Sequence, residues 1–152
     1  MPDMKVRSAL LLLTSMSLFA QCDDVYISAK QAKRASGVVF QGTIVGFKGS
    51  EVDRTVVFRV SRVWKGRVGV TFEMPAIETT GSLCNAFWSG ALVLGNELVV
   101  YAYHDPFFFK GKYVPIRQKS VPVSSAKDIN RLGPGRKPKR RPEDSGNAEP
   151  PG

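Results

Sequence analysis

Few residues of this chain have the types and spacing that catalysis requires. Histidine occurs once, as His104, at the end of an apolar run. No acid pair, no Ser-His-acid order and no metal-ligand spacing accompanies it. Glu73 and Glu78 flank Pro75 without a partner acid or base, and two distant cysteines with one histidine do not make a zinc site. We therefore expect a protein that is not an enzyme and that needs no metal or cofactor.

The first 20 residues have the pattern of a secretory signal peptide. Lys5 and Arg7 precede a short apolar run at 9–13, and Ala20 supplies the small residue at the expected cleavage point. The run is too short to cross a bilayer and no second one follows, so we expect no transmembrane span. The predicted product starts at Gln21 and is secreted, either periplasmic or extracellular.

A lipid anchor at Cys22 is the alternative to a freely secreted product. A different peptidase would then cut directly before Cys22, which would become diacylated. That peptidase prefers a small residue before the cysteine, and Gln21 is not small. We favour the unanchored form for this reason.

The remaining sequence predicts one domain at 21–132 and a tail at 133–152. A chain of 152 residues with 43% apolar and 23% charged residues has room for one globular domain. The tail consists mainly of Gly, Pro and charged residues, so we expect it to be disordered. For its cations we favour a solvated tail over contact with an anionic surface. The net charge of +9 lies mostly in the domain, which is basic without being extreme.

The domain has the patterning of a small β protein. In one segment Val56, Phe58 and Val60 point one way and Val57, Arg59 and Ser61 the other, which is the alternation of a β-strand. The run at 98–103 is continuously apolar, which suggests cover on both faces. The five predicted strands are Val38–Phe47, Thr55–Trp64, Val68–Met74, Leu92–Tyr103 and Tyr113–Ile116.

Two short helices accompany these strands, one at Ala29–Ala35 and one at Ser124–Leu132. Ser124 or Ser125 would cap the second helix and Gly133 would end it. Five strands with a long connection between the third and fourth fit a five-stranded OB-fold barrel better than a sandwich. The sequence thus predicts an all-β fold with minor helices, an OB-fold barrel and a short C-terminal helix.

Several short motifs follow one another in a particular order. They are Val39-Phe40-Gln41-Gly42, Val57-Phe58-Arg59-Val60, Val63-Trp64-Lys65-Gly66, Cys84, and the run from Gly95 to Ala102. In order and spacing they resemble the netrin-like, or tissue-inhibitor-of-metalloproteinases-like (TIMP-like), domain, and above all its short secreted bacterial members. The resemblance covers about Cys22 to Leu132. It implies an OB-type barrel whose N-terminal segment is pinned to the barrel by disulfides.

For this chain the resemblance implies a disulfide between Cys22 and Cys84. Cysteines of an exported chain tend to pair, and closing a loop of about 60 residues would stabilise the fold by on the order of 4 kcal/mol. Two free thiols are the alternative. Many family members have a second bridge, but Asp24 and the region 114–117 stand at its two positions here, and neither contains cysteine.

In animal inhibitors of this family, the amine and carbonyl of the N-terminal cysteine chelate a protease zinc. Cleavage after Ala20 would leave Gln21 in front of Cys22 and block this chelation until Gln21 is removed. The partner implied is a zinc metalloproteinase or another extracellular protein. The protease-binding or partner-binding residues implied are Cys22, Asp23, Asp24, Thr80, Gly81, Ser82 and Leu83.

A second surface is predicted at the three consecutive phenylalanines. From a strand they cannot all face one core, so at least one should lie exposed at a loop tip; a loop folded back over the barrel end is the alternative. This surface would suit an adaptor that binds a protein or an anionic polymer without inhibiting a protease. Export argues against nucleic acid as the physiological ligand. The secondary binding loop comprises Phe107, Phe108, Phe109, Lys110 and Lys112.

Overall fold

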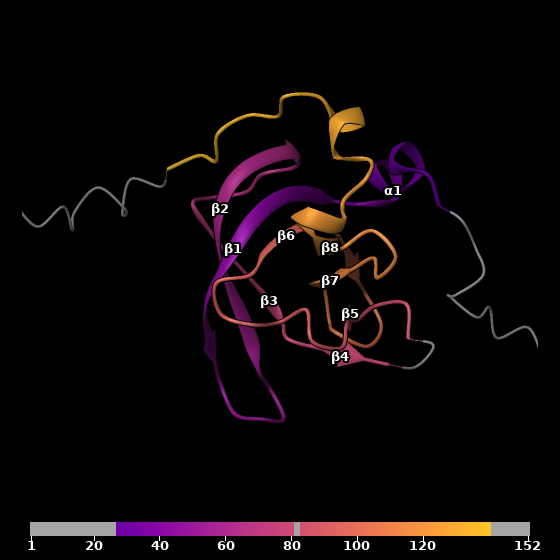
Figure 1. Ribbon diagram of the computed structural model, residues 1–152. Helices are drawn as coiled ribbons and strands as arrows, with labels where there is room; N and C mark the ends of the chain where they lie inside the picture. Colours follow the sequence, from indigo (N-terminus) through magenta and orange to yellow (C-terminus); the bar gives the residue numbers. More distant parts are fainter. Residues whose placement is uncertain (1–26, 81–82, 141–152) are drawn as a thin grey trace, which may run out of the picture.

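The computed structural model of the protein describes residues 27–80 and 83–140, and their fold is mostly β (Figure 1). The predicted signal peptide lies outside the described residues. None of the described helices is long and apolar enough to cross a membrane. The elements in chain order are α1 (Ala29–Ala35), β1 (Val38–Lys48), β2 (Thr55–Lys65), β3 (Thr71–Pro75), β4 (Glu78–Thr79), β5 (Phe87–Trp88), β6 (Glu97–Asp105), β7 (Lys112–Pro115), β8 (Val121–Pro122), and the 3-10 helices η1 (Val123–Ser125) and η2 (Ile129–Leu132).

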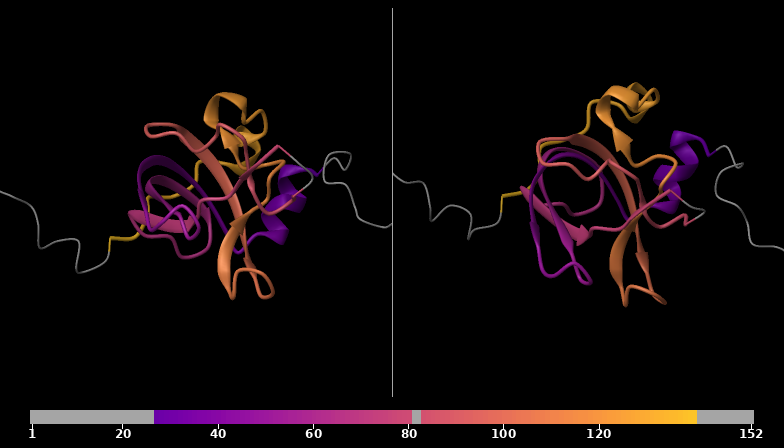
Figure 2. Two further views of the ribbon diagram at one scale, coloured as in Figure 1. Left: turned by 90° about the horizontal axis from the view of Figure 1, so that it is seen from below. Right: turned by 60° about the horizontal axis from the view of Figure 1, so that its bottom comes forward.

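The main sheet is antiparallel and has the strand order β3-β2-β1-β6-β7, with β8 paired to β6. A separate pair of parallel strands consists of β4 and β5. The pairing of β1 with β2 shifts register at three places, the last between Ile44 and Gly46. Such shifts bend a strand and increase its twist, and the sheet is strongly curved (Figure 2).

The hydrophobic core has two parts, one on each side of β6. Leu98, Val100 and Ala102 belong to the cluster on the concave side, together with the phenylalanines of β1 and β2. Val99 and Tyr101 belong to a second cluster beneath α1 and the 3-10 helices. The continuous apolar run of β6 is therefore covered on both faces, which confirms the sequence prediction.

Helix α1 has the predicted bounds because both of its ends are specified locally. The hydroxyl of Ser28 accepts a hydrogen bond from the N–H of Gln31 at 3.1 Å, and the Ser28 N–H donates to Gln31 Oε1 at 3.0 Å. This reciprocal capping box satisfies two donors that a helix start leaves unpaired. Ala29 and Ala32 on its inner face are buried, so the helix covers the second core cluster.

The predicted helix at Ser124–Leu132 is wrong in type, because the chain forms two 3-10 helices there instead. Val123, Ala126, Ile129 and Leu132 all pack into the second core cluster. They recur every third residue, which is the period of a 3-10 helix and not of an α-helix. The spacing of the apolar side chains that reach the sheet therefore selects the tighter helix.

The prediction of disorder from 133 onward is wrong for 133–140. Arg136 exchanges two backbone hydrogen bonds with Val63 of β2, both 2.8 Å long, and the Lys139 N–H donates to the Val68 carbonyl at 3.2 Å. The Gly, Pro and charged residues of this segment have little apolar side-chain area to bury. Their backbone groups can still pair with an open strand beside them, and here they pair with β2. The rest of the predicted tail lies outside the described residues.

Candidate functional site

The turn before β5 and the β6–β7 hairpin meet around a hollow of about 450 Å³. Leu83 from the turn is 54% exposed, and Phe107 and Phe108 from the hairpin are each 83% exposed. We call these three residues the apolar rim. Figure 2 shows the hairpin projecting from the rest of the fold. The hollow is lined by Leu83, Cys84, Asn85, Tyr103, Asp105, Pro106, Phe107 and Phe108.

The loop that carries the phenylalanines is fixed by its own backbone and by Asp105. The carboxylate of Asp105 accepts hydrogen bonds from the N–H groups of Phe107 at 2.8 Å and Phe108 at 3.0 Å. The Gly111 N–H donates to the Asp105 carbonyl at 2.7 Å. Aspartate binding the N–H groups that follow it is a common way to stabilise a turn. The exposed rings therefore stand on an ordered loop.

The pKa of Asp105 reflects this role. Burial raises the pKa, but hydrogen bonds from the backbones of Phe107 and Phe108 and from the side chain of Asn85 outweigh it, so the pKa lies below 3.8. Asn85 belongs to the turn before β5, so its bond also joins that turn to the hairpin. The carboxylate of Asp105 thus stabilises the loop and its contact with the turn before β5.

The other side of the rim is held by Arg117, which is completely buried. Its backbone N–H donates to the Cys84 carbonyl at 3.2 Å, and its guanidinium lies 4.3 Å from the ring centre of Trp88. Arg117 is buried but Trp88 is 39% exposed, so this cation–π contact contributes on the order of 1 kcal/mol. Arg117 lies in the region where the resemblance expects the cysteine of a second bridge. Its backbone hydrogen bond to Cys84 links this region to the turn although no cysteine is present there.

The side chains with catalytic potential make contacts within the fold. His104 Nδ1 lies 2.6 Å from the Gly111 carbonyl oxygen; since that oxygen only accepts, Nδ1 carries the proton. The Glu78 carboxylate accepts from the Leu92 N–H at 2.7 Å, and that of Glu73 pairs with Lys48. Among residues 27–80 and 83–140, no three His, Cys, Asp or Glu side chains gather as a metal site.

The structure brings Leu83 of the first predicted surface to Phe107 and Phe108 of the second, around the hollow. Thr80 and Leu83 of the first are exposed, while Cys22, Asp23, Asp24, Gly81 and Ser82 lie outside the described residues. In the second, the exposure of Phe107 and Phe108 confirms the prediction of an exposed loop tip. Phe109 is half-buried, and Lys112 lies 3.8 Å from Asp53.

Sequence reasoning missed the residues that support the rim. Asp105 before Pro106 is a turn signal and could have been found. Trp88 and Arg117 are far apart in the sequence, and neither has a local pattern that indicates their contact. Asn85 reaches Asp105 across a similar gap, so only the folded chain shows this bond.

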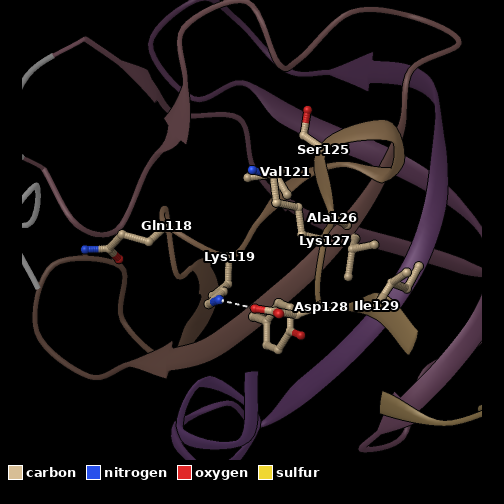
Figure 3. A pocket seen from close by; sticks show the side chains of 10 residues that line it. Gln118, Lys119, Val121, Ser125, Ala126, Lys127, Asp128 and Ile129 are labelled. Atoms are coloured by element: carbon tan, nitrogen blue, oxygen red, sulfur yellow. Dashed lines mark hydrogen bonds and ion pairs between the residues drawn. The ribbon is translucent and has the colours of Figure 1, made fainter. Parts of the chain in front are cut away.

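A second hollow, of about 320 Å³, lies between the sheet and the 3-10 helices (Figure 3). Lys119 Nζ lies 2.8 Å from Asp128 Oδ2 across it. The hydrogen bond and the charge of Lys119 lower the pKa of Asp128. Burial, and secondarily the charge of Asp128, raises the pKa of Tyr101 to about 12. Lys119 and Asp128 neutralise each other, and the exposed Lys127 also lines this hollow.

No protein-family model, curated protein or solved structure matches this chain. The resemblance to the netrin-like domain therefore stays a prediction. Evidence about function comes from the apolar rim, where exposed aromatic side chains stand on a hydrogen-bonded loop beside a hollow.

Proposed function

We propose that this protein is a non-enzymatic binding module that docks a partner protein on the apolar rim. The observation that carries this proposal is the 83% exposure of both Phe107 and Phe108 on a loop that Asp105 orders. Large exposed aromatic side chains beside a hollow are typical of interaction sites. The partner would insert an apolar side chain between these rings and Leu83.

The support beneath the rim favours tight binding. A partner that docks on a loop already held by hydrogen bonds loses less free energy to ordering than one that docks on a mobile loop. Asp105 holds the hairpin side, and Arg117 with Trp88 holds the turn side. The rings are thus preorganised anchors of the kind that dominate binding energy at interfaces.

We further infer that the sheet closes into an OB-type barrel of the kind that the netrin-like resemblance implies. Strands β3 and β7, at the two ends of the sheet order, lie in contact, and the rings of Phe72 and Tyr113 join them at 5.4 Å between centroids. Both strands run in the direction of β1, since each is antiparallel to a neighbour of β1. This order and these directions fit a five-stranded Greek-key barrel.

Photo-crosslinking in the native host tests the rim. A photoreactive amino acid replaces Phe107 in one variant and Leu94 in a control; Leu94 is 61% exposed on a different loop. We expect a discrete covalent adduct with another protein from position 107 and none from position 94. Adducts from both positions alike, or from neither, would refute a specific docking surface.

Inhibition of a zinc metalloproteinase is the second candidate, and one observation favours it. Cys84 lies on the hollow beside Leu83, and the described chain contains no free cysteine. A bridge from Cys22 would bring the N-terminal segment to the apolar rim, where both would face one protease. The chelating amine would have to belong to Cys22 itself.

Two preparations test this candidate, one beginning at Cys22 and the other at Gln21. Intact mass with and without reduction verifies the first residue and the disulfide, and a panel of zinc proteases is titrated with each form. We expect inhibition only by the form that begins at Cys22. Inhibition by neither form at micromolar concentration leaves the binding module without protease inhibition.

A further inference from the structure

We propose a second binding surface, a cationic strip that binds a linear acidic polysaccharide. The strip runs along the outer side of β2 and the ordered C-terminal segment beside it, away from the apolar rim. Figure 1 shows this segment, the end of the coloured chain, passing over β2. Its exposed cations are Arg59, Arg62, Arg67, Arg136, Lys137, Lys139 and Arg140.

The segment that supplies four of these cations is attached to β2 at several points. The indole N–H of Trp64 donates to the Gly133 carbonyl at 2.8 Å. Arg136 pairs with Val63 through two backbone bonds, and its guanidinium donates to the Gly66 carbonyl. Two runs of cations from distant parts of the sequence are therefore held side by side.

The two stretches of described chain that carry these cations contain no acidic residue. The sequence has none from Arg54 to Phe72 and none from Ile129 to Arg140. None of the seven cations forms an ion pair with another residue of the described chain. Lys65 is different, because its ammonium donates to the carbonyls of Lys33 and Arg34 at the end of α1. Seven exposed cations that have no ion-pair partner among residues 27–80 and 83–140 are a site for an anionic partner.

The form of the strip favours a polysaccharide over other polyanions. Neither β2 nor 133–140 has an exposed large apolar or aromatic side chain. The strip therefore has no ring on which the bases of a single-stranded nucleic acid could stack, and no apolar anchor for a bilayer. A linear polymer with a sulfate or carboxylate on successive sugars needs only a row of cations, and arginine pairs with such groups through two hydrogen bonds.

Heparin serves as the probe of the strip. The double variant Lys137→Gln/Lys139→Gln removes two exposed charges, and Lys30→Gln/Lys127→Gln removes two exposed charges elsewhere as the matched control. We expect the strip variant to bind heparin about tenfold more weakly at physiological salt and with a shallower salt dependence. The control should bind like the wild type. Equal weakening of both variants would reduce the effect to net charge and overturn the proposal.

A third variant tests the geometry and not the charge. Trp64→Phe removes the indole bond to Gly133 and keeps every cation. We expect weaker heparin binding and faster tryptic cleavage after Arg136, with thermal unfolding showing that the domain is still folded. Wild-type affinity with a released segment would refute a built strip. Tighter binding of the wild type to single-stranded DNA or to phosphatidylserine vesicles than to heparin would assign the strip to those polyanions instead.

Discussion

Asp105 shows how one carboxylate controls a functional loop. Its oxygens bind the N–H groups of Phe107 and Phe108, and Asn85 binds it from the turn before β5. The charged form is the one that accepts these bonds, because an ionised carboxylate only accepts. The arrangement of the apolar rim therefore depends on ionisation of Asp105.

The pKa of Asp105 predicts how the loop responds to acid. Because this pKa is below 3.8 in the folded protein, the bonds of the carboxylate stabilise the fold fully above its unfolded pKa. This stabilisation is lost as the pH falls through the lower folded value. Following the amide NMR shifts of Phe107 and Phe108 from pH 6 to pH 2 should give a midpoint below 3.8.

Asp105→Asn is the control for this titration. Its amide cannot ionise, so the same amide shifts should stay flat across this pH range. Loop dynamics at neutral pH should resemble those of the acidified wild type. A wild-type midpoint at or above 3.8 would contradict the hydrogen-bonded role of Asp105.

At the scale of elements, alternation and turn residues predict the long strands but not the short ones. The five predicted strands all exist, with β3 starting at Thr71 and β6 at Glu97 instead of a few residues earlier. Strands β4, β5 and β8 have two residues each, which is too few for a period. Their pairing is set by the rest of the fold. Leu83 and Phe107 are likewise distant in the sequence, and only the rest of the fold brings them together at the hollow.

Gly66 directly follows β2, at a position where the structure requires glycine. Its φ of 81° is in the left-handed region, and a Cβ there would lie 2.4 Å from the Gly37 carbonyl oxygen. Gly66→Ala should therefore lower the free energy of unfolding by about 3 kcal/mol. Urea denaturation measures this loss.

Gly46→Ala is the matched control in the same sheet. Gly46 lies in β1, and a Cβ there would meet no atom within 4 Å. This substitution should change the free energy of unfolding by less than about 1 kcal/mol in either direction. Equal losses at Gly46 and Gly66 would mean that the close approach at Gly37 is unimportant.

For the whole molecule, stability at high pH depends on the packing of the 3-10 helices η1 and η2 against β6, which we call the joint. Tyr101 is 3% exposed at this joint, and its pKa is raised to about 12 from 10.0. The folded protein favours the neutral phenol, so this contribution is complete below pH 10 and is lost as the pH rises through about 12. The free energy of unfolding should fall over this range.

Tyr101→Phe should remove most of that fall, because phenylalanine has no proton to lose. Urea unfolding at several pH values between 9 and 11.5, with absorbance at 295 nm to follow tyrosinate, compares the two proteins. A smaller dependence should remain, since burial also raises the pKa of Tyr103. An identical pH dependence in both proteins would show that Tyr101 ionises without unfolding the joint.

The ordered C-terminal segment has one more consequence, for self-association. Strand β3 pairs with β2 at Thr55–Arg59 and the Val60 N–H donates to the Val70 carbonyl, so the part of β2 after Val60 would offer free backbone groups to another chain. The segment occupies them at Val63, and its cations repel a second copy. Natural β proteins protect the outer strands of their sheets in these two ways. We therefore expect residues 133–140, which present charge to a partner, also to oppose self-association of the protein at high concentration.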